Sequence, residues 1–310
     1  MTDPSAPDAA TAPSRRAVLR RWGSLAVGGA ATAGSAALAG CAGRDGDETT
    51  GADGDRGAPD PPLIAHRGFA AENPENTVAA VEAAAATTDR IELDVRRCGT
   101  GELVAFHDAT LGRVTDATGR VSETPYERLA ALSVEGSGEP VPTLADALDA
   151  APADAWVMLD LKERGVAADA VAAGADRDHG VAVAADDPAV IEAAAAAAPA
   201  VPTVYGVRES VPARALRPLV PGPVGGASPP QWAYPPQDVA GMIETATDLG
   251  CAAVSPRYEL CLGTDLVPRA RDAGLRVLPW TVASVREYEA VAAAGVDAVV
   301  SDVSRGRRET

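Results

Sequence analysis

The chain has 310 residues, and its hydrophobic fraction of 46% excludes a wholly disordered protein. Its 44 acidic and 27 basic residues give a net charge of −17, which excludes a general nucleic-acid-binding protein because such proteins need a basic surface. Aromatic residues make up only 4% of the chain, so its core has to be built mainly from smaller apolar side chains.

The first forty residues are typical of an export signal. Residues 14–20 (Ser-Arg-Arg-Ala-Val-Leu-Arg) resemble a twin-arginine signal, and residues 23–40 form a mildly apolar stretch without charges. Residues 38–41 (Leu-Ala-Gly-Cys) resemble a lipobox. We therefore predict a signal peptide over residues 1–40 and a lipid on Cys41 that holds the exported protein on the outer face of the cell membrane. An exported protein without lipid and an uncleaved anchor are the alternatives.

Residues 41–60 consist largely of glycine, aspartate, alanine and threonine, which predicts an acidic, flexible tether. The remaining part, residues 61–310, has about the usual size of a (β/α)8 barrel. If Cys41 carries lipid, three cysteines remain, with no metal-like spacing. Export permits a disulfide between Cys251 and Cys261, and buried free thiols are the alternative.

Short apolar strands alternate with alanine-rich helical stretches over residues 61–310. The pattern predicts helices that include 77–86, 188–198, 264–273 and 284–294, and strands at 63–66, 90–96, 156–161, 181–185, 203–207, 251–255, 275–281 and 297–301. Eight such strands favour an α/β fold of the (β/α)8 TIM-barrel type over an open sheet. Few residues follow Ser301, which predicts a shortened or missing last helix.

A β-hairpin is predicted after the second strand. Residues 97–101 (Arg-Cys-Gly-Thr-Gly) are typical of a tight turn, and residues 102–107 would then run back antiparallel to that strand. The returning strand brings His107 to the level of Glu92 and Asp94.

Polar side chains cluster where several predicted strands end, which is where barrel enzymes carry their chemistry. Strand alternation places Glu92 and Asp94 on one face, and it does the same for Asp160 and Lys162. Three carboxylates aimed into one barrel mouth raise a pKa or bind a cation. Their all-oxygen ligands predict one hard divalent cation, Mg²⁺ or Ca²⁺.

Two histidines and two fixed positive charges accompany these acids. His66 and His107 are suited to take and give protons near neutral pH. Arg67 and Lys162 are suited to neutralise phosphoryl oxygens. Together with a cation, these groups predict phosphoryl transfer on a phosphodiester.

The ordered motifs resemble those of the glycerophosphodiester phosphodiesterase family, within the phosphatidylinositol-phospholipase-C-like barrels. The resemblance covers essentially all of residues 63–302 and rests on seven segments: 66–68 (His-Arg-Gly), 74–77 (Pro-Glu-Asn-Thr), 92–94 (Glu-Leu-Asp), 106–108 (Phe-His-Asp), 160–162 (Asp-Leu-Lys), 280–282 (Trp-Thr-Val) and 295–302 (Gly-Val-Asp through Ser-Asp).

The resemblance implies a role for each site residue. His66 and His107 would be the acid–base pair. Glu92, Asp94 and Asp160 would bind the cation. Arg67, Lys162 and Trp280 would bind substrate. Arg67 and Lys162 would contact its phosphate, and Trp280 would line the pocket. The implied reaction is attack by the glycerol hydroxyl of the substrate, which gives a cyclic phosphate that water then opens.

Two segments depart from the family pattern. Asp160 stands where the family usually has glutamate, as in the related sphingomyelinase-D-like toxins, and residues 184–186 (Ala-Ala-Asp) replace a common Ser-Phe pair. We predict hydrolysis of a small-molecule glycerophosphodiester to glycerol phosphate and an alcohol, at a membrane surface and without nucleic acid. The alternatives are a phospholipase-D-like cleavage of lysophospholipids and a non-catalytic, surface-tethered barrel that binds phosphoesters.

Simpler interpretations of the same residues stay open from the sequence. Glu92 and Asp94 would pair with nearby arginines if that strand face were solvated. Asp160 and Lys162 would form only a salt bridge. Trp280 would serve in packing alone.

Overall fold

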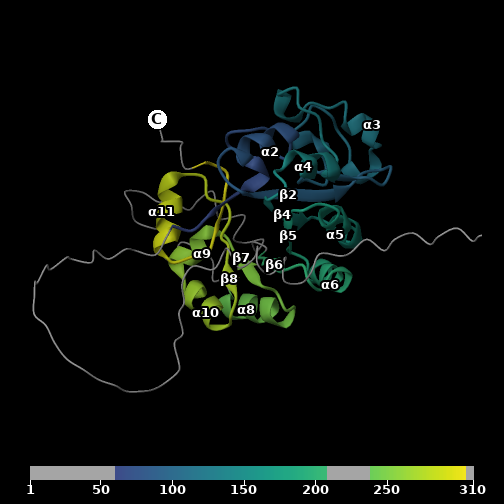
Figure 1. Cartoon of the computed structure of the whole chain (residues 1–310). Helices are drawn as coiled ribbons and strands as arrows, with labels where there is room; N and C mark the ends of the chain where they lie inside the picture. The colour runs from purple at the N-terminus through teal and green to yellow at the C-terminus, as the bar shows by residue number, and fades with distance from the viewer. Residues whose placement is uncertain (1–59, 208–237, 305–310) are drawn as a thin grey trace, which may run out of the picture.

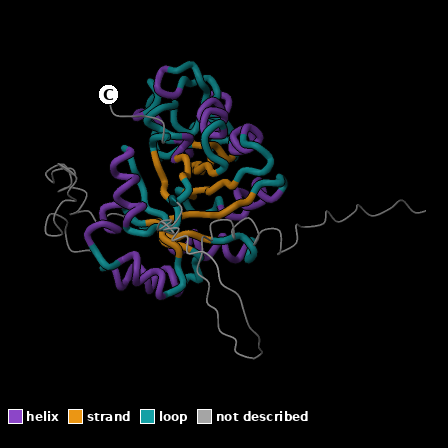
Figure 2. The backbone as a smooth tube through the Cα atoms, turned by 60° about the vertical axis from the view of Figure 1, so that its left-hand side comes forward, coloured by secondary structure: helices purple, strands orange, loops and turns teal. Residues whose placement is uncertain are grey.

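A computed structural model describes residues 60–207 and 238–304 of the chain (Figure 1). The predicted signal peptide, the lipobox and nearly all of the tether lie outside these residues. Figure 2 shows the strands gathered at the centre with helices around them. This arrangement confirms the predicted α/β fold with a parallel, curled sheet.

The sheet contains nine strands. Eight of them follow the order β8-β7-β6-β5-β4-β2-β1-β9, and β3 is paired with β2 outside this path. All ladders are parallel except the one between β2 and β3. The strands are β1 (Leu63–Ala65), β2 (Arg90–Arg97), β3 (Leu103–Ala105), β4 (Trp156–Leu161), β5 (Gly180–Ala185), β6 (Thr203–Gly206), β7 (Ala253–Ser255), β8 (Arg276–Val277) and β9 (Val299–Ser301).

Backbone hydrogen bonds join β9 to the segment that follows β8. Val300 donates from its amide to the carbonyl of Pro279 at 3.0 Å, and Val282 donates to the carbonyl of Val300 at 3.0 Å. The strand predicted over 275–281 is thus regular only at Arg276–Val277, but its continuation still contacts β9. Because β9 also pairs with β1, it contacts β1 on one side and the segment after β8 on the other.

The helices follow the strands along the chain. They are α2 (Val78–Ala85), α3 (Tyr126–Leu129), α4 (Leu144–Ala150), α5 (Ala167–Ala175), α6 (Pro188–Ala197), α8 (Val239–Asp248), α9 (Tyr258–Gly263), α10 (Leu266–Asp272) and α11 (Val285–Ala293). The hydroxyls of Thr77 and Ser284 cap α2 and α11 by accepting from backbone amides. The four predicted helices correspond to α2, α6, α10 and α11. The helices α3, α4, α5, α8 and α9 were not among the helical segments named from the sequence.

Strand alternation divides the core into two layers. One apolar cluster combines helix residues with one face of the strands, for example Leu93 of β2 and Leu159 of β4. A second cluster draws its buried residues from the opposite strand faces and contains no helix residue, so it fills the inside of the curled sheet: Ile64, Trp156, Met158, Ala182, Ala184, Val204, Ala253, Leu278, Ala298 and Val300. Glu92, Asp94 and Asp160 belong to this inner face by register.

Strand β3 returns along β2, with Val95 opposite Ala105 and Arg97 opposite Leu103. The amide of Phe106 still donates to the carbonyl of Asp94 at 3.0 Å, and the chain then leaves the ladder at His107. Residues 106–143 form an inserted segment, which supplies most of a third small apolar cluster, including Phe106 and Leu129; Cys98 and Val104 complete this cluster. This segment contains α3 and the 3-10 turns η2 (Leu111–Arg113), η3 (Val121–Glu123) and η4 (Val134–Gly136).

A tight turn connects β1 to the first loop. Arg67 and Phe69 both adopt left-handed backbone conformations, and Gly68 between them has φ +79°. A Cβ atom on Gly68 would lie 2.6 Å from the Cβ of Ala80 in α2. Glycine is therefore required here by both conformation and space, and the close approach of α2 fixes the turn η1 (His66–Gly68).

Residues 302–304 follow β9 without forming a helix, and the rest of the predicted shortened or missing last helix falls on residues 305–310, outside the described part. Within the two described ranges, no helix combines the length and hydrophobicity that crossing a membrane requires. Cys98, Cys251 and Cys261 are buried free thiols, which is the alternative to the disulfide considered from the sequence.

Candidate active site

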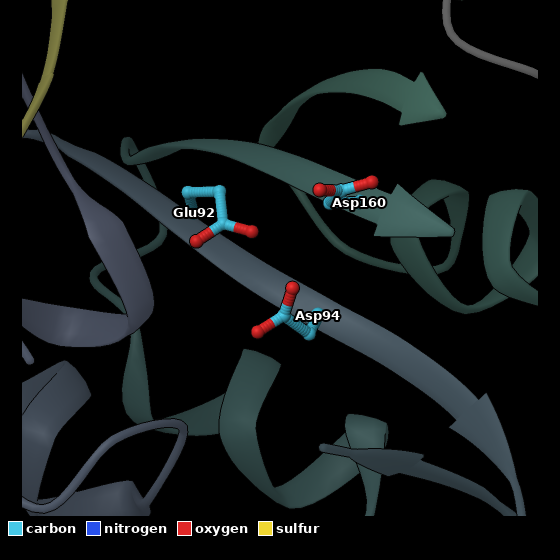
Figure 3. A group of neighbouring side chains, drawn as sticks. All are labelled: Glu92, Asp94 and Asp160. Atoms are coloured by element: carbon cyan, nitrogen blue, oxygen red, sulfur yellow. The ribbon is translucent and has the colours of Figure 1, made fainter. Parts of the chain in front are cut away.

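Three carboxylates converge on the inner face of the sheet. Glu92 and Asp94 extend from β2, and Asp160 extends from β4 toward them (Figure 3). Asp94 and Asp160 are register partners in the parallel ladder, so the two side chains lie at the same level. One carboxylate oxygen from each of the three residues lies within 4.8 Å of the others. This acidic triad is the set of residues that the sequence predicted as cation ligands.

Asp94 is the most strongly neutralised member of the acidic triad. Its side chain is fully buried, and its oxygens lie 2.9 Å from Arg67 Nε and 2.9 Å from Lys162 Nζ. The amide nitrogen of Asn76 donates to Asp94 Oδ2 at 2.8 Å. Burial alone would raise the pKa of Asp94, but the positive charges of Arg67 and Lys162 hold it well below its ordinary value.

The electrostatic environment of Glu92 is the opposite of that of Asp94. Its Oε2 atom accepts a hydrogen bond from the Arg67 amide at 2.9 Å, whereas Oε1 is buried and has no hydrogen-bond partner among the described residues. Burial, followed by the charges of Asp94 and Asp160, raises the pKa of Glu92 well above its ordinary value. An unpartnered carboxylate oxygen beside two other carboxylates fits a divalent cation, which would supply the missing positive charge.

Each of the two predicted catalytic histidines is held by a carboxylate. His66 Nδ1 lies 2.6 Å from Asp302 Oδ1, and His107 Nδ1 lies 2.7 Å from Asp108 Oδ1. A carboxylate accepts hydrogen bonds, so both Nδ1 atoms carry the proton and both Nε2 atoms are left for other partners. The two histidines therefore have the same tautomer and the same kind of support.

Both histidines act on the acidic triad electrostatically. His107 and His66 are among the groups that lower the pKa of Asp94. Burial is the largest influence on His107 and lowers its pKa, with Arg67 and Lys162 adding to the effect and Asp94 opposing it. A lowered pKa favours the neutral form of the His107 imidazole, which is the form that can act as a base.

Arg67 and Lys162 lie between these carboxylates. Besides its contact with Asp94, Arg67 donates from Nη1 to Glu75 Oε2 at 3.1 Å. Lys162 Nζ also lies 2.5 Å from Asp160 Oδ2, which is the salt bridge considered from the sequence. Burial lowers the pKa of Lys162, but Asp160, Asp94 and Glu92 together raise it, so its ammonium group stays charged.

Trp280 lies at the end of the segment after β8, where it packs against the inner apolar cluster. Its indole nitrogen donates to the carbonyl of Ser255 at 2.8 Å, and the guanidinium of Arg257 lies 5.6 Å from the centre of its ring. These contacts show a packing role and do not test the predicted contact with substrate.

The solvated-face interpretation of Glu92 and Asp94 is wrong, because both are buried. Arg90 and Arg96 pair instead with Asp89 and Glu163. The sequence did not predict a role for Asp302 or Asp108, although both lie in segments that resemble the family. The signal for Asp302 is strand alternation, since it is two positions beyond Val300 on the inner face.

A family model described as "Glycerophosphoryl diester phosphodiesterase family" matches residues 66–305. The chain belongs to this family. The match contains all of the predicted site residues, and it confirms the resemblance inferred from the motifs.

Curated relatives align over parts of their length. A glycerophosphodiester phosphodiesterase of Caldanaerobacter subterraneus is 37% identical over 94 residues, which cover 28% of this chain and 39% of that protein. The human glycerophosphodiester phosphodiesterase 1 is 36% identical over 94 residues, which cover 27% of this chain and 28% of that protein. The alignments span from 28% to 40% of the length of the curated relatives.

Solved structures of the family share the fold over most of this chain. A phosphodiesterase of Oleispira antarctica, solved with the product sn-glycerol-3-phosphate, has a TM-score of 0.61 and 25% identity and covers 79% of this chain and 94% of its own. A putative glycerophosphoryl diester phosphodiesterase of Agrobacterium tumefaciens has a TM-score of 0.63 at 19% identity, with 79% of this chain and 94% of its own covered. These likenesses support the TIM-barrel assignment.

Proposed function

We propose that this chain hydrolyses glycerophosphodiesters to glycerol phosphate and an alcohol. The observation that carries the proposal is the pair of histidines, each held at Nδ1 by a carboxylate and both acting on Asp94 of the acidic triad. Family membership supports the reaction class. The bound sn-glycerol-3-phosphate of the Oleispira antarctica structure supports glycerol phosphate as the product.

In the proposed reaction, a hydroxyl of the glycerol moiety attacks phosphorus, and the bond from phosphorus to the leaving alcohol breaks. One of the imidazoles of His66 and His107 takes the proton of the attacking hydroxyl, and the other gives a proton to the leaving oxygen. Water then opens the cyclic phosphate with the two roles reversed. Arg67 and Lys162 neutralise the phosphoryl oxygens, and Trp280 lines the pocket.

Glu92, Asp94 and Asp160 are the residues proposed to hold one divalent cation, Mg²⁺ or Ca²⁺. Its positive charge would stabilise negative charge that develops on the phosphoryl group. The unpartnered Oε1 atom of Glu92 is the contact that supports this proposal most directly.

The test is incubation of the purified chain with glycerophosphocholine, with and without Mg²⁺ or Ca²⁺. Release of glycerol phosphate and choline only when a cation is present supports the proposal. Cleavage of lysophosphatidylcholine alone, with choline and a cyclic product, supports the phospholipase-D-like alternative. Saturable binding without turnover supports a non-catalytic barrel and contradicts the proposal.

We also propose that the chain is exported and anchored by lipid at Cys41. Support comes from the twin-arginine-like residues 14–20 and the lipobox-like residues 38–41. The expected result is that the native protein enters the detergent phase on phase separation, whereas Cys41→Ser stays in the aqueous phase. Equal partitioning of both forms would contradict the anchor.

A further inference from the structure

Arg113 lies at the end of η2 in the inserted segment and has no role in the proposed reaction. Its guanidinium contacts two carboxylates at once. Nη1 and Nη2 donate to Glu75 Oε2 and Oε1 at 2.8 and 2.5 Å, and Nε donates to Asp108 Oδ2. Arg113 therefore connects the loop after β1 with the loop after β3, using the forked geometry that only arginine offers.

The Glu75 end of this connection is fixed. Glu75 is only 5% exposed and also accepts a hydrogen bond from Arg67. Burial would raise the pKa of Glu75, but the hydrogen bonds from Arg113 and the charge of Arg67 lower it overall. Arg113 is thus bound to an ionised carboxylate that the protein interior holds in place.

The Asp108 end reaches a proposed catalytic group. Asp108 uses Oδ1 to accept from His107 and Oδ2 to accept from Arg113. The side chains of Asp108 and His107 are 25% and 34% exposed, so packing alone does not hold either of them. Without Arg113, the Asp108 carboxylate would be free to rotate toward water and release the imidazole.

We propose that Arg113 is a positioning residue, which fixes the Asp108 carboxylate, and through it the His107 imidazole, to the buried Glu75. The inference rests on the proposed function of His107 as acid or base. Arg113 acts on turnover more than on substrate binding, because Arg67 makes its own contacts with Glu75 and Asp94, and these do not pass through Arg113.

The first test compares Arg113→Ala, Arg113→Lys and Arg120→Ala in the full chain. We expect Arg113→Ala to lower kcat by about 10- to 100-fold, the cost of a slightly misplaced catalytic group, with KM within about threefold. Arg113→Lys should recover part of kcat, because an ammonium group replaces the charge but not the fork. Arg120 is the matched control, since its ion pair in the same segment is long, at 3.9 Å, and exposed.

A double-mutant cycle tests the path of the effect. If Arg113 acts through Asp108, Arg113→Ala combined with Asp108→Asn should be no more than about threefold slower than the slower single variant. Effects that multiply, or a change confined to KM, would overturn the inference.

The second test needs no turnover. The chain has only three histidines, so their imidazole nitrogen signals can be assigned one by one. The nitrogen chemical shifts of His107 then report its tautomer, and His179 is the internal reference. We expect an Nδ1-protonated His107 in the wild type and a mixture of tautomers in Arg113→Ala. An unchanged His107 signal in that variant would overturn the inference. An inactive wild type with the expected tautomers would instead contradict the proposed function.

Discussion

Lys162 forms an ion pair with the fully buried Asp94, with 2.9 Å between Nζ and Oδ1. Arg67 contacts the other carboxylate oxygen of Asp94, also at 2.9 Å. A single aspartate therefore connects the two side chains proposed to bind phosphate, Arg67 and Lys162, to the acidic triad. Because Asp94 has both partners, a change at this position is expected to alter the proposed metal site and the proposed phosphate contacts together.

The first prediction concerns this aspartate. Asp94→Asn removes the central negative charge of the acidic triad and should weaken the affinity for Mg²⁺ or Ca²⁺ by about 10- to 100-fold. Calorimetric titration of the purified chain with each cation measures the change, and Asp89→Asn, at an exposed position before β2, is the control. A wild-type cation titration in Asp94→Asn would count against its role as a ligand.

The second prediction concerns the support of His66. His66→Ala should lower turnover of glycerophosphocholine by about 10²- to 10⁴-fold, the usual contribution of one acid–base group. Asp302→Asn keeps the imidazole but loses the accepting carboxylate, so its expected loss is smaller, about 10- to 100-fold. His179→Ala is the control, because His179 Nε2 bonds to the carbonyl of Leu148 at 3.0 Å, away from the acidic triad. Unchanged rates in His66→Ala would remove the proposed role.

The third prediction concerns the turn that positions His66 and Arg67. Gly68→Ala should lower the free energy of unfolding by about 2 kcal/mol or more, because strain at positive φ and a clash with Ala80 add together. Gly274→Ala is the matched control, with φ +77° and no atom within 4 Å of the added Cβ. Thermal melting of both variants isolates the cost of the clash. Equal losses in the two variants would show that α2 adapts to the methyl group.

The fourth prediction concerns the buried thiols. Burial raises the pKa of Cys261 to about 12, and it also raises the pKa of Cys251. In a Cys41→Ser background, a thiol reagent at pH 8 should therefore react slowly with the native chain and fully after denaturation. Rapid reaction of Cys251 or Cys261 in the native chain would contradict this prediction.

The raised pKa of Cys261 also makes stability depend on pH. Because Cys261 ionises more easily when unfolded, its contribution to the free energy of unfolding is complete below its ordinary pKa and is lost as the pH rises toward 12.

Much of the acidic triad was predictable from the sequence because strand alternation is a local rule. The pattern of β2 places Leu93 under the helices and Glu92 and Asp94 on the inner face, and β4 repeats the pattern with Asp160. The order of the strands then follows from the barrel fold.

The remaining contacts depend on irregular backbone, which carries no periodic signal. Arg113 lies in a 3-10 turn of the inserted segment, and its two carboxylate partners belong to different loops. The strand predicted over 275–281 is regular only at Arg276–Val277, although backbone bonds from the following segment to β9 persist. Neither feature follows from composition or spacing.

The pairing of His66 with Asp302 has a consequence for how activity arises during synthesis. The two residues are 236 positions apart, and they meet only after β9 has inserted beside β1. A nascent chain that has emerged without its last strand would lack the carboxylate that orients the imidazole. The proposed activity therefore requires β9 to have paired with β1, and the onset of turnover would report that this pairing is complete.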